Sequence, residues 1–188
     1  MIRAQKRLAP EARREQLIVA AIACYGELGV ERAGHGDIAK KTGVSTATVF
    51  NYLGSRESLT ESVFETVYDV FRNMFDTLPE PGQTPQKYIQ NLAVSYNFLV
   101  EQHPDIVKVV LNWSASFGGT VRPQYLEFQE WVLSGIQERL HRANSDKSHA
   151  RIVLAAAYAY ASMKLDNTPD DVMTRFVERV IAAIVSDA

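Results

Sequence analysis

The stretch from His35 to Arg56 constrains the fold more than any other part of this 188-residue chain. Ile38 and Ala39 give a first short helix one apolar edge. Gly43 can end that helix because glycine tolerates a left-handed backbone. A serine follows at position 45, where it can cap a second helix by accepting a hydrogen bond from a free amide group. Two short helices joined by a glycine turn are the parts of a helix-turn-helix, which this stretch predicts.

The second of these helices, over residues 46–53, is expected to have one buried and one exposed face. Val49 and Leu53 are four residues apart, so both should turn inward against Ile38. The side chains left facing outward are Thr46, Thr48 and Asn51. All three can donate and accept hydrogen bonds, and asparagine suits the edge of adenine in the major groove. The pattern therefore predicts a helix that reads DNA bases.

Short helical hairpins with glycine turns occur in many folds, so a purely structural role is the alternative to DNA binding. Two flanking features favour DNA. Residues 1–32 supply a basic arm, with Arg3, Lys6 and Arg7, followed by an amphipathic helix, and Arg56 opens the next helix. A three-helix head needs such parts to brace its reading helix and to grip phosphates, and basic arms often enter the minor groove.

Charge is distributed unevenly along the chain. Residues 1–60 carry nine Lys and Arg against six Asp and Glu, whereas the remainder carries eleven against sixteen. A basic head on an acidic body is typical of a phosphate-binding module attached to a domain that does not bind phosphate. Random unevenness of solvated faces is the alternative explanation of so small an excess.

Composition limits the class of protein. With 46% hydrophobic residues the chain can bury a sizeable core, in one domain or two small ones. It contains no apolar run of about 18 residues and no apolar core of a signal peptide, so no membrane partner is expected. The expected location is the cytoplasm, in association with the nucleoid. The single cysteine, Cys24, excludes a disulfide framework and is predicted to be a buried, inert thiol.

Helical periodicity continues to the end of the chain. Ser55 can cap a long apolar-striped helix that Pro79 and Pro81 end, and Pro123 begins a later one carrying Leu126. No run of alternating strand residues interrupts the pattern, so the predicted fold class is all-α. We expect a helix-turn-helix DNA-binding domain with its basic N-terminal arm over residues 1–53. A helical regulatory and dimerisation domain is expected over residues 54–188.

The last two helices, predicted over about 146–164 and 169–186, favour a homodimer. The first is crowded with small residues that permit close helix approach, and these are Ala155, Ala156, Ala157, Ala159 and Ala161. The second has an apolar stripe wider than one neighbour needs. Two subunits pairing through these helices would suit a two-fold DNA site, which needs two heads about 34–36 Å apart. The alternative is that both helices simply complete the core of one subunit.

Enzyme signatures are poor. The chain has no Gly-x-Ser-x-Gly, no phosphate loop and no His-Glu-x-x-His. Glu138 and His141 form one Glu-x-x-His pair, but a di-iron bundle needs two such pairs. We therefore expect no catalytic residue, metal or cofactor. Two rival functions stay open: a small-molecule-binding helical protein whose basic head contacts a protein partner, and a helical enzyme.

The aromatic and methionine positions of the body could form core or a ligand pocket. Tyr96 and Gln129 would place polar groups on faces otherwise lined by apolar side chains. A few polar groups in an apolar cleft suit a small ligand. A small apolar ligand is therefore a second candidate partner, and plain core packing is the alternative.

Several runs of the sequence resemble a known family. They are Gly34-His35 through Asp37-Ile38-Ala39, Ala47-Thr48-Val49-Phe50-Asn51-Tyr52, Arg56-Glu57 and Trp113-Ser114-Ala115-Ser116. In these runs the head resembles the DNA-binding domain of TetR-type transcriptional regulators. More narrowly, it is similar to the LuxR/HapR-type quorum-sensing master regulators of vibrios. The similarity is dense from Arg7 to Arg56 and thin after Ser116.

This resemblance implies a dimeric regulator that binds pseudo-palindromic promoter sites, with Asn51 reading bases and Tyr52 and Arg56 meeting the DNA backbone. One of the two arm arginines of the family falls on Arg7 and the other on Gln5, where Lys6 or Arg3 could substitute. The DNA-binding candidates are thus Arg3, Lys6, Arg7, Ser45, Thr46, Thr48, Asn51, Tyr52 and Arg56. The family pocket would fall on Phe71, Met74, Phe75, Leu92, Tyr96, Val110, Gln129, Leu133 and Ala157. Val110 stands where the relatives carry a tryptophan.

Overall fold

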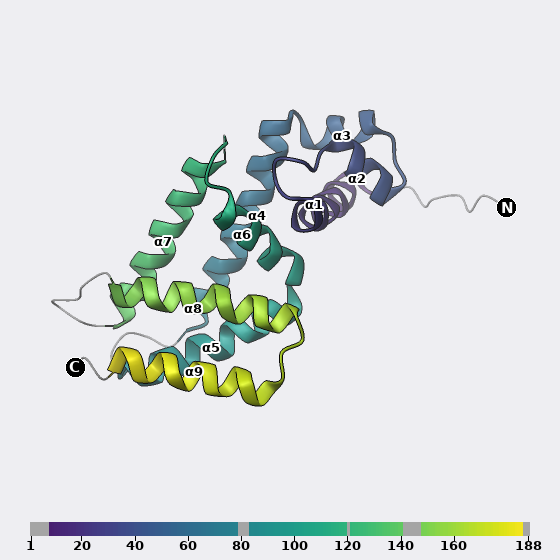
Figure 1. Cartoon of the computed structure of the whole chain (residues 1–188). Helices are drawn as coiled ribbons and strands as arrows, with labels where there is room; N and C mark the ends of the chain where they lie inside the picture. The colour runs from purple at the N-terminus through teal and green to yellow at the C-terminus, as the bar shows by residue number, and fades with distance from the viewer. Residues whose placement is uncertain (1–7, 79–82, 120, 141–147, 186–188) are drawn as a thin grey trace.

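The computed structural model describes residues 8–78, 83–119, 121–140 and 148–185, and these form nine α-helices without a β-strand (Figure 1). The prediction of an all-α fold is confirmed. The helices are α1 Pro10–Leu28, α2 His35–Thr42, α3 Thr46–Leu53, α4 Arg56–Asp76, α5 Pro85–Gln102, α6 Pro104–Ala115, α7 Arg122–Leu140, α8 Ser148–Leu165 and α9 Asp170–Val185. Within those ranges, no helix combines the length and the hydropathy that crossing a membrane requires.

Helices α1, α2 and α3 form a compact head. Gly43 ends α2 with φ 69° and ψ 26°, the left-handed conformation predicted for it. Ile38, Val49 and Leu53 are almost fully buried between the helices, so the predicted inward face of α3 is confirmed. The head therefore has a core of its own that fixes which side of α3 meets solvent.

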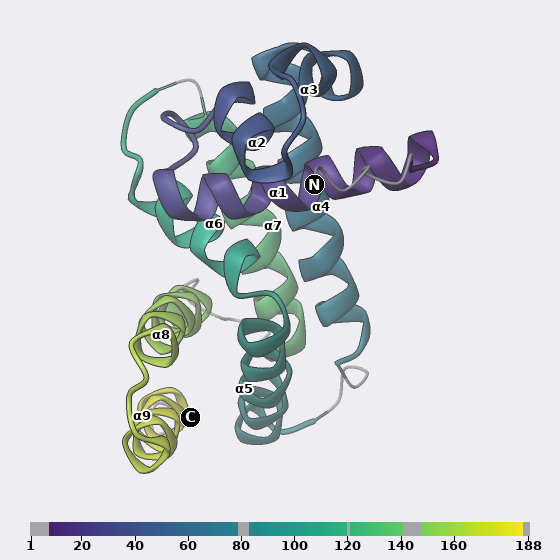
Figure 2. The ribbon, with the colours of Figure 1, turned by 90° about the vertical axis from the view of Figure 1, so that its right-hand side faces the viewer.

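Helix α4 leaves the head and runs down into the body (Figure 2). Ser55 caps it as predicted, because the Ser55 Oγ accepts a hydrogen bond from the Ser58 amide at 3.3 Å. Near its start, the buried Thr60 Oγ1 lies 3.0 Å from the hydroxyl of Tyr25 on α1. Phe64 then stacks on Trp113 of α6. One helix thus contacts both the head and the body core.

The head also rests directly on α6. A side chain at Gly26 of α1 would meet the Asp105 carbonyl oxygen at 3.1 Å and the Lys108 Cβ at 3.2 Å. Asn112 of α6 donates from Nδ2 to the Gly26 carbonyl at 2.9 Å. Glycine suits this position because the two helices approach closely, and a larger residue would push its neighbours apart. As a result α1 and α6 contact each other backbone to backbone.

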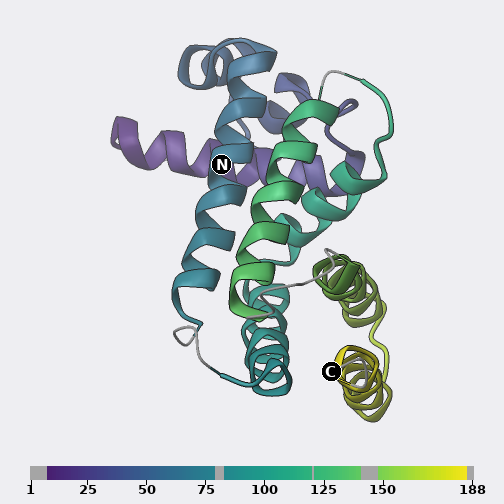
Figure 3. The same ribbon diagram turned by 90° about the vertical axis from the view of Figure 1, so that its left-hand side faces the viewer.

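The body contains α5 to α9, with α8 and α9 packed side by side at one edge (Figure 3). On helix α7 the expected apolar residues Leu133, Ile136 and Leu140 are buried, but Leu126 is 46% exposed, whereas Tyr125 and Phe128 are buried. At the start of the helix the Tyr125 side chain turns inward, and Leu126, about 100° away around the helix axis, meets solvent. The Tyr125 hydroxyl has two polar partners inside the body, which hold this side chain inward.

Candidate nucleic-acid interface

Helix α3 presents a solvent-facing side opposite its buried residues Val49 and Leu53. The exposed side chains on this side are Thr46, Ala47, Phe50 and Asn51. The sequence patterns single out only the first and last of these four. Ala47 and Phe50 lie three or four residues from Thr46 or Asn51, which puts them on the same side of the helix. This helical spacing is the sequence signal from which Ala47 and Phe50 could also have been predicted to face outward. The outward face is therefore partly polar and partly apolar.

The N-terminal end of α3 is built around Ser45 and Thr48. The Ser45 Oγ accepts from the Thr48 amide at 3.1 Å, and the two hydroxyl groups lie 2.8 Å apart. The predicted cap is thereby confirmed. Thr48, however, is half-buried with its hydroxyl engaged, rather than pointing freely outward. The reason is that a serine cap brings its oxygen over the first turn of the helix, where Thr48 lies.

Tyr52 and Arg56 lie beside this face with most of their contacts inside the protein. Tyr52 is half-buried and packs against the core. The Arg56 guanidinium donates to the Val30 carbonyl at 3.2 Å and to the Glu31 carbonyl. Arg56 therefore ties the turn between α1 and α2 to the start of α4. Its remaining N–H groups stay available, because a guanidinium has five donors.

Two lysines lie at the end of α2. Lys40 is exposed at the end of α2, and the Lys41 Nζ lies 2.7 Å from the Glu27 carboxylate. The predicted arm residues Arg3, Lys6 and Arg7 lie outside the described residues, so their contact with DNA stays a prediction.

Across the parts of the chain that the structure describes, no three His, Cys, Asp or Glu side chains could hold a metal ion. His141 is also outside these parts.

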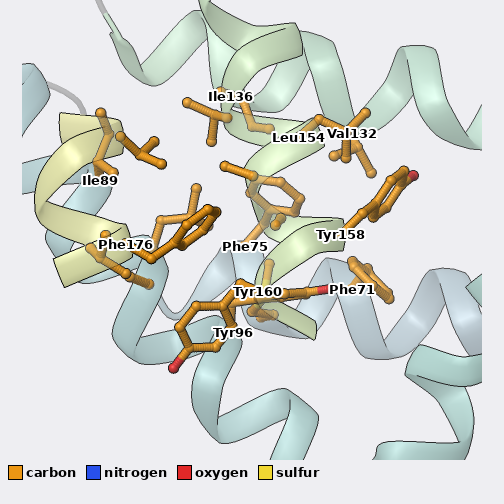
Figure 4. A pocket seen from close by; sticks show the side chains of 18 residues that line it. Phe71, Phe75, Ile89, Tyr96, Val132, Ile136, Leu154, Tyr158, Tyr160 and Phe176 are labelled. Carbon is orange, nitrogen blue, oxygen red and sulfur yellow. The ribbon is translucent and has the colours of Figure 1, made fainter. Parts of the chain in front are cut away.

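A second candidate site is an apolar cavity of about 70 Å³ between α4, α5, α7, α8 and α9 (Figure 4). Six of the nine residues that the resemblance places in a pocket line it, and they are Phe71, Met74, Phe75, Leu92, Tyr96 and Ala157. Val110, Gln129 and Leu133 do not line it. Val110 and Leu133 are instead buried in the body core.

Gln129 is connected to this cavity through two tyrosines. Its Nε2 donates to the Tyr125 hydroxyl at 2.9 Å, which lies 3.0 Å from the hydroxyl of Tyr158, a lining residue. Figure 4 shows the Tyr96 and Tyr158 hydroxyl groups at the outer edge of the lining cluster. Burial raises the pKa of both tyrosines, so the two hydroxyls are uncharged at neutral pH. The surface facing the cavity is therefore almost entirely apolar.

Comparison with known proteins identifies the family. Residues 17–63 match the family model described as "Bacterial regulatory proteins, tetR family". The regulator BetI of Vibrio campbellii is 32% identical over 164 residues, which cover 82% of this chain and 77% of that protein. The chain belongs to the tetR family. The family match spans α1 to α3 and the start of α4, so it contains the whole outward face of α3.

Two further comparisons extend this tetR assignment. The regulator LuxR of Vibrio harveyi is 35% identical over 124 residues, or 66% of this chain. The chain spans 60% of the length of that relative. The crystal structure of a transcriptional regulator from Rhodococcus has a TM-score of 0.75 at 18% identity, and the match covers 93% of this chain and 97% of that one. The fold shared with that regulator therefore extends through the body as well as the head.

Proposed function

We propose that this tetR-family chain is a sequence-specific DNA-binding transcriptional regulator that acts as a homodimer on pseudo-palindromic promoter sites. The observation that carries the proposal is the solvent-facing side of α3, where Thr46 and Asn51 are exposed on a helix-turn-helix. Such side chains can bond base edges in the major groove, where each base pair has a distinct pattern. The place of action would be the nucleoid in the cytoplasm.

The other contacts would position the protein on the duplex. Tyr52 and Arg56 would meet the phosphate backbone next to α3, and the arm with Arg3, Lys6 and Arg7 would enter the adjacent minor groove. The phosphate contacts fix the register but carry no sequence information directly, whereas the minor groove distinguishes A·T from G·C pairs. Ser45 and Thr48 lie at the N-terminal end of α3, which is the end that enters the groove in helix-turn-helix proteins.

The homodimer would form through α8 and α9. The Ala155 and Ala159 side chains are exposed on one side of α8, four residues apart, where they leave room for a second helix. Ile152 on α8 is 42% exposed and Val172 on α9 is 38% exposed. Exposed small and apolar residues on two adjacent helices favour a four-helix interface between two subunits. Such an interface would set the distance between the two heads.

The cavity would take a small apolar ligand that modulates DNA binding. A ligand can shift the protein between two arrangements of the heads only if it binds one arrangement more tightly. The 35% identity to LuxR of Vibrio harveyi favours a role related to that of this regulator, and we propose that the chain acts in quorum sensing.

Selection of duplexes from random DNA by the purified protein tests this proposal. We expect a pseudo-palindromic sequence to be enriched, with the logarithm of affinity falling steeply against the logarithm of salt concentration. Asn51→Ala should cost roughly 1–3 kcal/mol at that site and relax its sequence preference. The control is Phe98→Ala, which removes a side chain 62% exposed on α5 and should leave affinity unchanged.

A failure to enrich any sequence, with no salt-dependent binding to any duplex, would reject DNA binding. It would favour the rival in which the basic head contacts a protein. Wild-type affinity of Asn51→Ala for the selected site would instead reject α3 as the reading helix.

A further inference from the structure

Phe50 lies among the outward-facing residues of α3 and is 55% exposed. Exposure alone does not single out this ring, since Phe98 and Phe117 are more exposed, but of these three phenylalanines it is Phe50 that lies on the proposed reading face of α3. We propose that Phe50 is a specificity-determining residue that contacts the 5-methyl group of a thymine in the major groove. The inference rests on the proposed DNA-binding function and names a base that the site must contain.

The Phe50 ring is supported from one side by His35. The two ring centroids are 5.5 Å apart, with the ring planes tilted by 39°. His35 is itself held in place, because its Nε2 donates to the Gly54 carbonyl at 2.8 Å. The imidazole thus joins the start of α2 to the end of α3 behind the phenyl ring. With one side occupied in this way, the exposed part of the ring projects away from the head.

The chemistry of the phenyl ring limits what it can contact in a groove. Phe50 has no hydroxyl group, so it cannot hydrogen-bond a phosphate or a base edge. The thymine methyl is the apolar group that the major groove offers, and phenylalanine and alanine are among the side chains that contact it. Ala47, three residues earlier on the same face, adds a methyl group of its own. Asn51 beside Phe50 suits adenine, so the two neighbours together favour A·T pairs.

Replacement of thymine by deoxyuridine tests the contact, because it removes only the 5-methyl group. The duplex has the sequence enriched from random DNA. Its thymines are replaced one at a time, first in one half-site and then in the other. For the wild type, we expect affinity to fall about fourfold at one position of each half-site, as expected for burying one methyl group. For Phe50→Ala, the same replacement should leave affinity unchanged. On the duplex that keeps its thymines, Phe50→Ala should bind more weakly than the wild type, by at least the same factor.

The matched control is Phe98→Ala, another exposed phenylalanine, which should keep the fourfold response of the wild type. Circular dichroism and thermal unfolding should show that Phe50→Ala folds normally, since the ring is more than half exposed. The inference is overturned if no deoxyuridine position weakens the wild type, or if Phe50→Ala shows the same fourfold response. A wild type that binds no duplex selectively would instead reject the proposed function itself.

Discussion

The aromatic rings of Phe64 and Trp113 stack with their centroids 3.7 Å apart and their planes 8° from parallel. Phe64 belongs to the part of α4 that follows the head, and Trp113 lies near the end of α6. The Trp113 ring also has its Nε1 donating to the Val121 carbonyl at 2.8 Å, and its edge faces Tyr125. This indole therefore joins α4, α6 and α7 at one point below the head.

Trp113→Ala is expected to lower the free energy of unfolding by about 3–5 kcal/mol, because the fully buried indole leaves a large cavity and its hydrogen bond to the Val121 carbonyl is lost. Urea unfolding followed by circular dichroism measures the loss. Phe117→Ala is the control: that ring is 83% exposed, and its removal should change stability by less than about 0.5 kcal/mol. Equal losses for both variants would contradict the role of the stack.

Arg56 is expected to stabilise the head and to contact a DNA phosphate, and two variants distinguish these roles. Arg56→Ala removes the bonds to the Val30 and Glu31 carbonyls and should cost about 1 kcal/mol of stability. It should also weaken binding to all duplexes alike and reduce the salt slope by about 1 if a phosphate contact is lost. Arg56→Lys should keep the salt slope but not the stability, because the shorter lysine side chain does not carry its ammonium to the position from which the Arg56 Nη2 donates to both carbonyls. An unchanged slope in Arg56→Ala would leave only the structural role.

The proposed dimer interface predicts that a charge at Ala159 on α8 separates the subunits. Ala159→Arg should convert the dimer to a monomer in light scattering coupled to size exclusion, and it should also reduce affinity for the two-fold DNA site. Val19→Arg provides the control for the oligomeric state, because Val19 is 67% exposed on α1 of the head, outside α8 and α9. A monomeric wild type, or a dimeric Ala159→Arg, would show that α8 is not the interface.

The apolar cavity should admit a small uncharged probe. An apolar cavity of roughly 150 Å³ binds benzene or xenon, and this one is about 70 Å³, so xenon is the better probe. Binding should stabilise the folded protein by about 0.4 kcal/mol at half saturation. Ala157→Leu, which fills the cavity, should abolish that gain in thermal unfolding under xenon pressure, whereas Val94→Leu should retain it. A gain that survives Ala157→Leu would place the xenon elsewhere.

The thiol of Cys24 is predicted to be inert. The side chain is 3% exposed, and burial raises the pKa of the thiol, so little of the reactive thiolate is present at neutral pH. A thiol reagent should label the folded protein much more slowly than the protein in urea. Equal rates in the two conditions would mean that α1 opens readily. The burial of Cys24 agrees with its position among apolar residues of a predicted helix.

Most of the helical framework could be predicted from local signals. Gly43 and Ser45 mark the turn and the start of α3 because each acts within one helical turn. The burial of Tyr125 rather than Leu126 at the start of α7 could not be predicted, since it depends on partners distant in sequence. Tyr125 turns inward to meet Tyr158, thirty-three residues later, and Leu126 is exposed as a consequence.

The candidate sites were only partly predictable for the same reason. Thr46 and Asn51 could be assigned to the outward face of α3 from helical spacing alone. Gln129 was expected at the pocket, but it is connected to the cavity wall only through hydrogen bonds that involve Tyr125 and Tyr158. A series of hydrogen-bonded side chains of this kind has no signature in the sequence. The Arg56 contacts also depend on a turn twenty-five residues earlier, which periodicity does not detect.

The missing side chain at Gly26 has a mechanical consequence. Because α1 lies against the backbone of α6 at that position, and Asn112 of α6 bonds the Gly26 carbonyl, the two helices have little room to move relative to each other there. A tilt of α6 would therefore move α1, and α3 with it, since α1, α2 and α3 share one core. This contact would couple the position of α6 in the body to the orientation of the proposed reading helix.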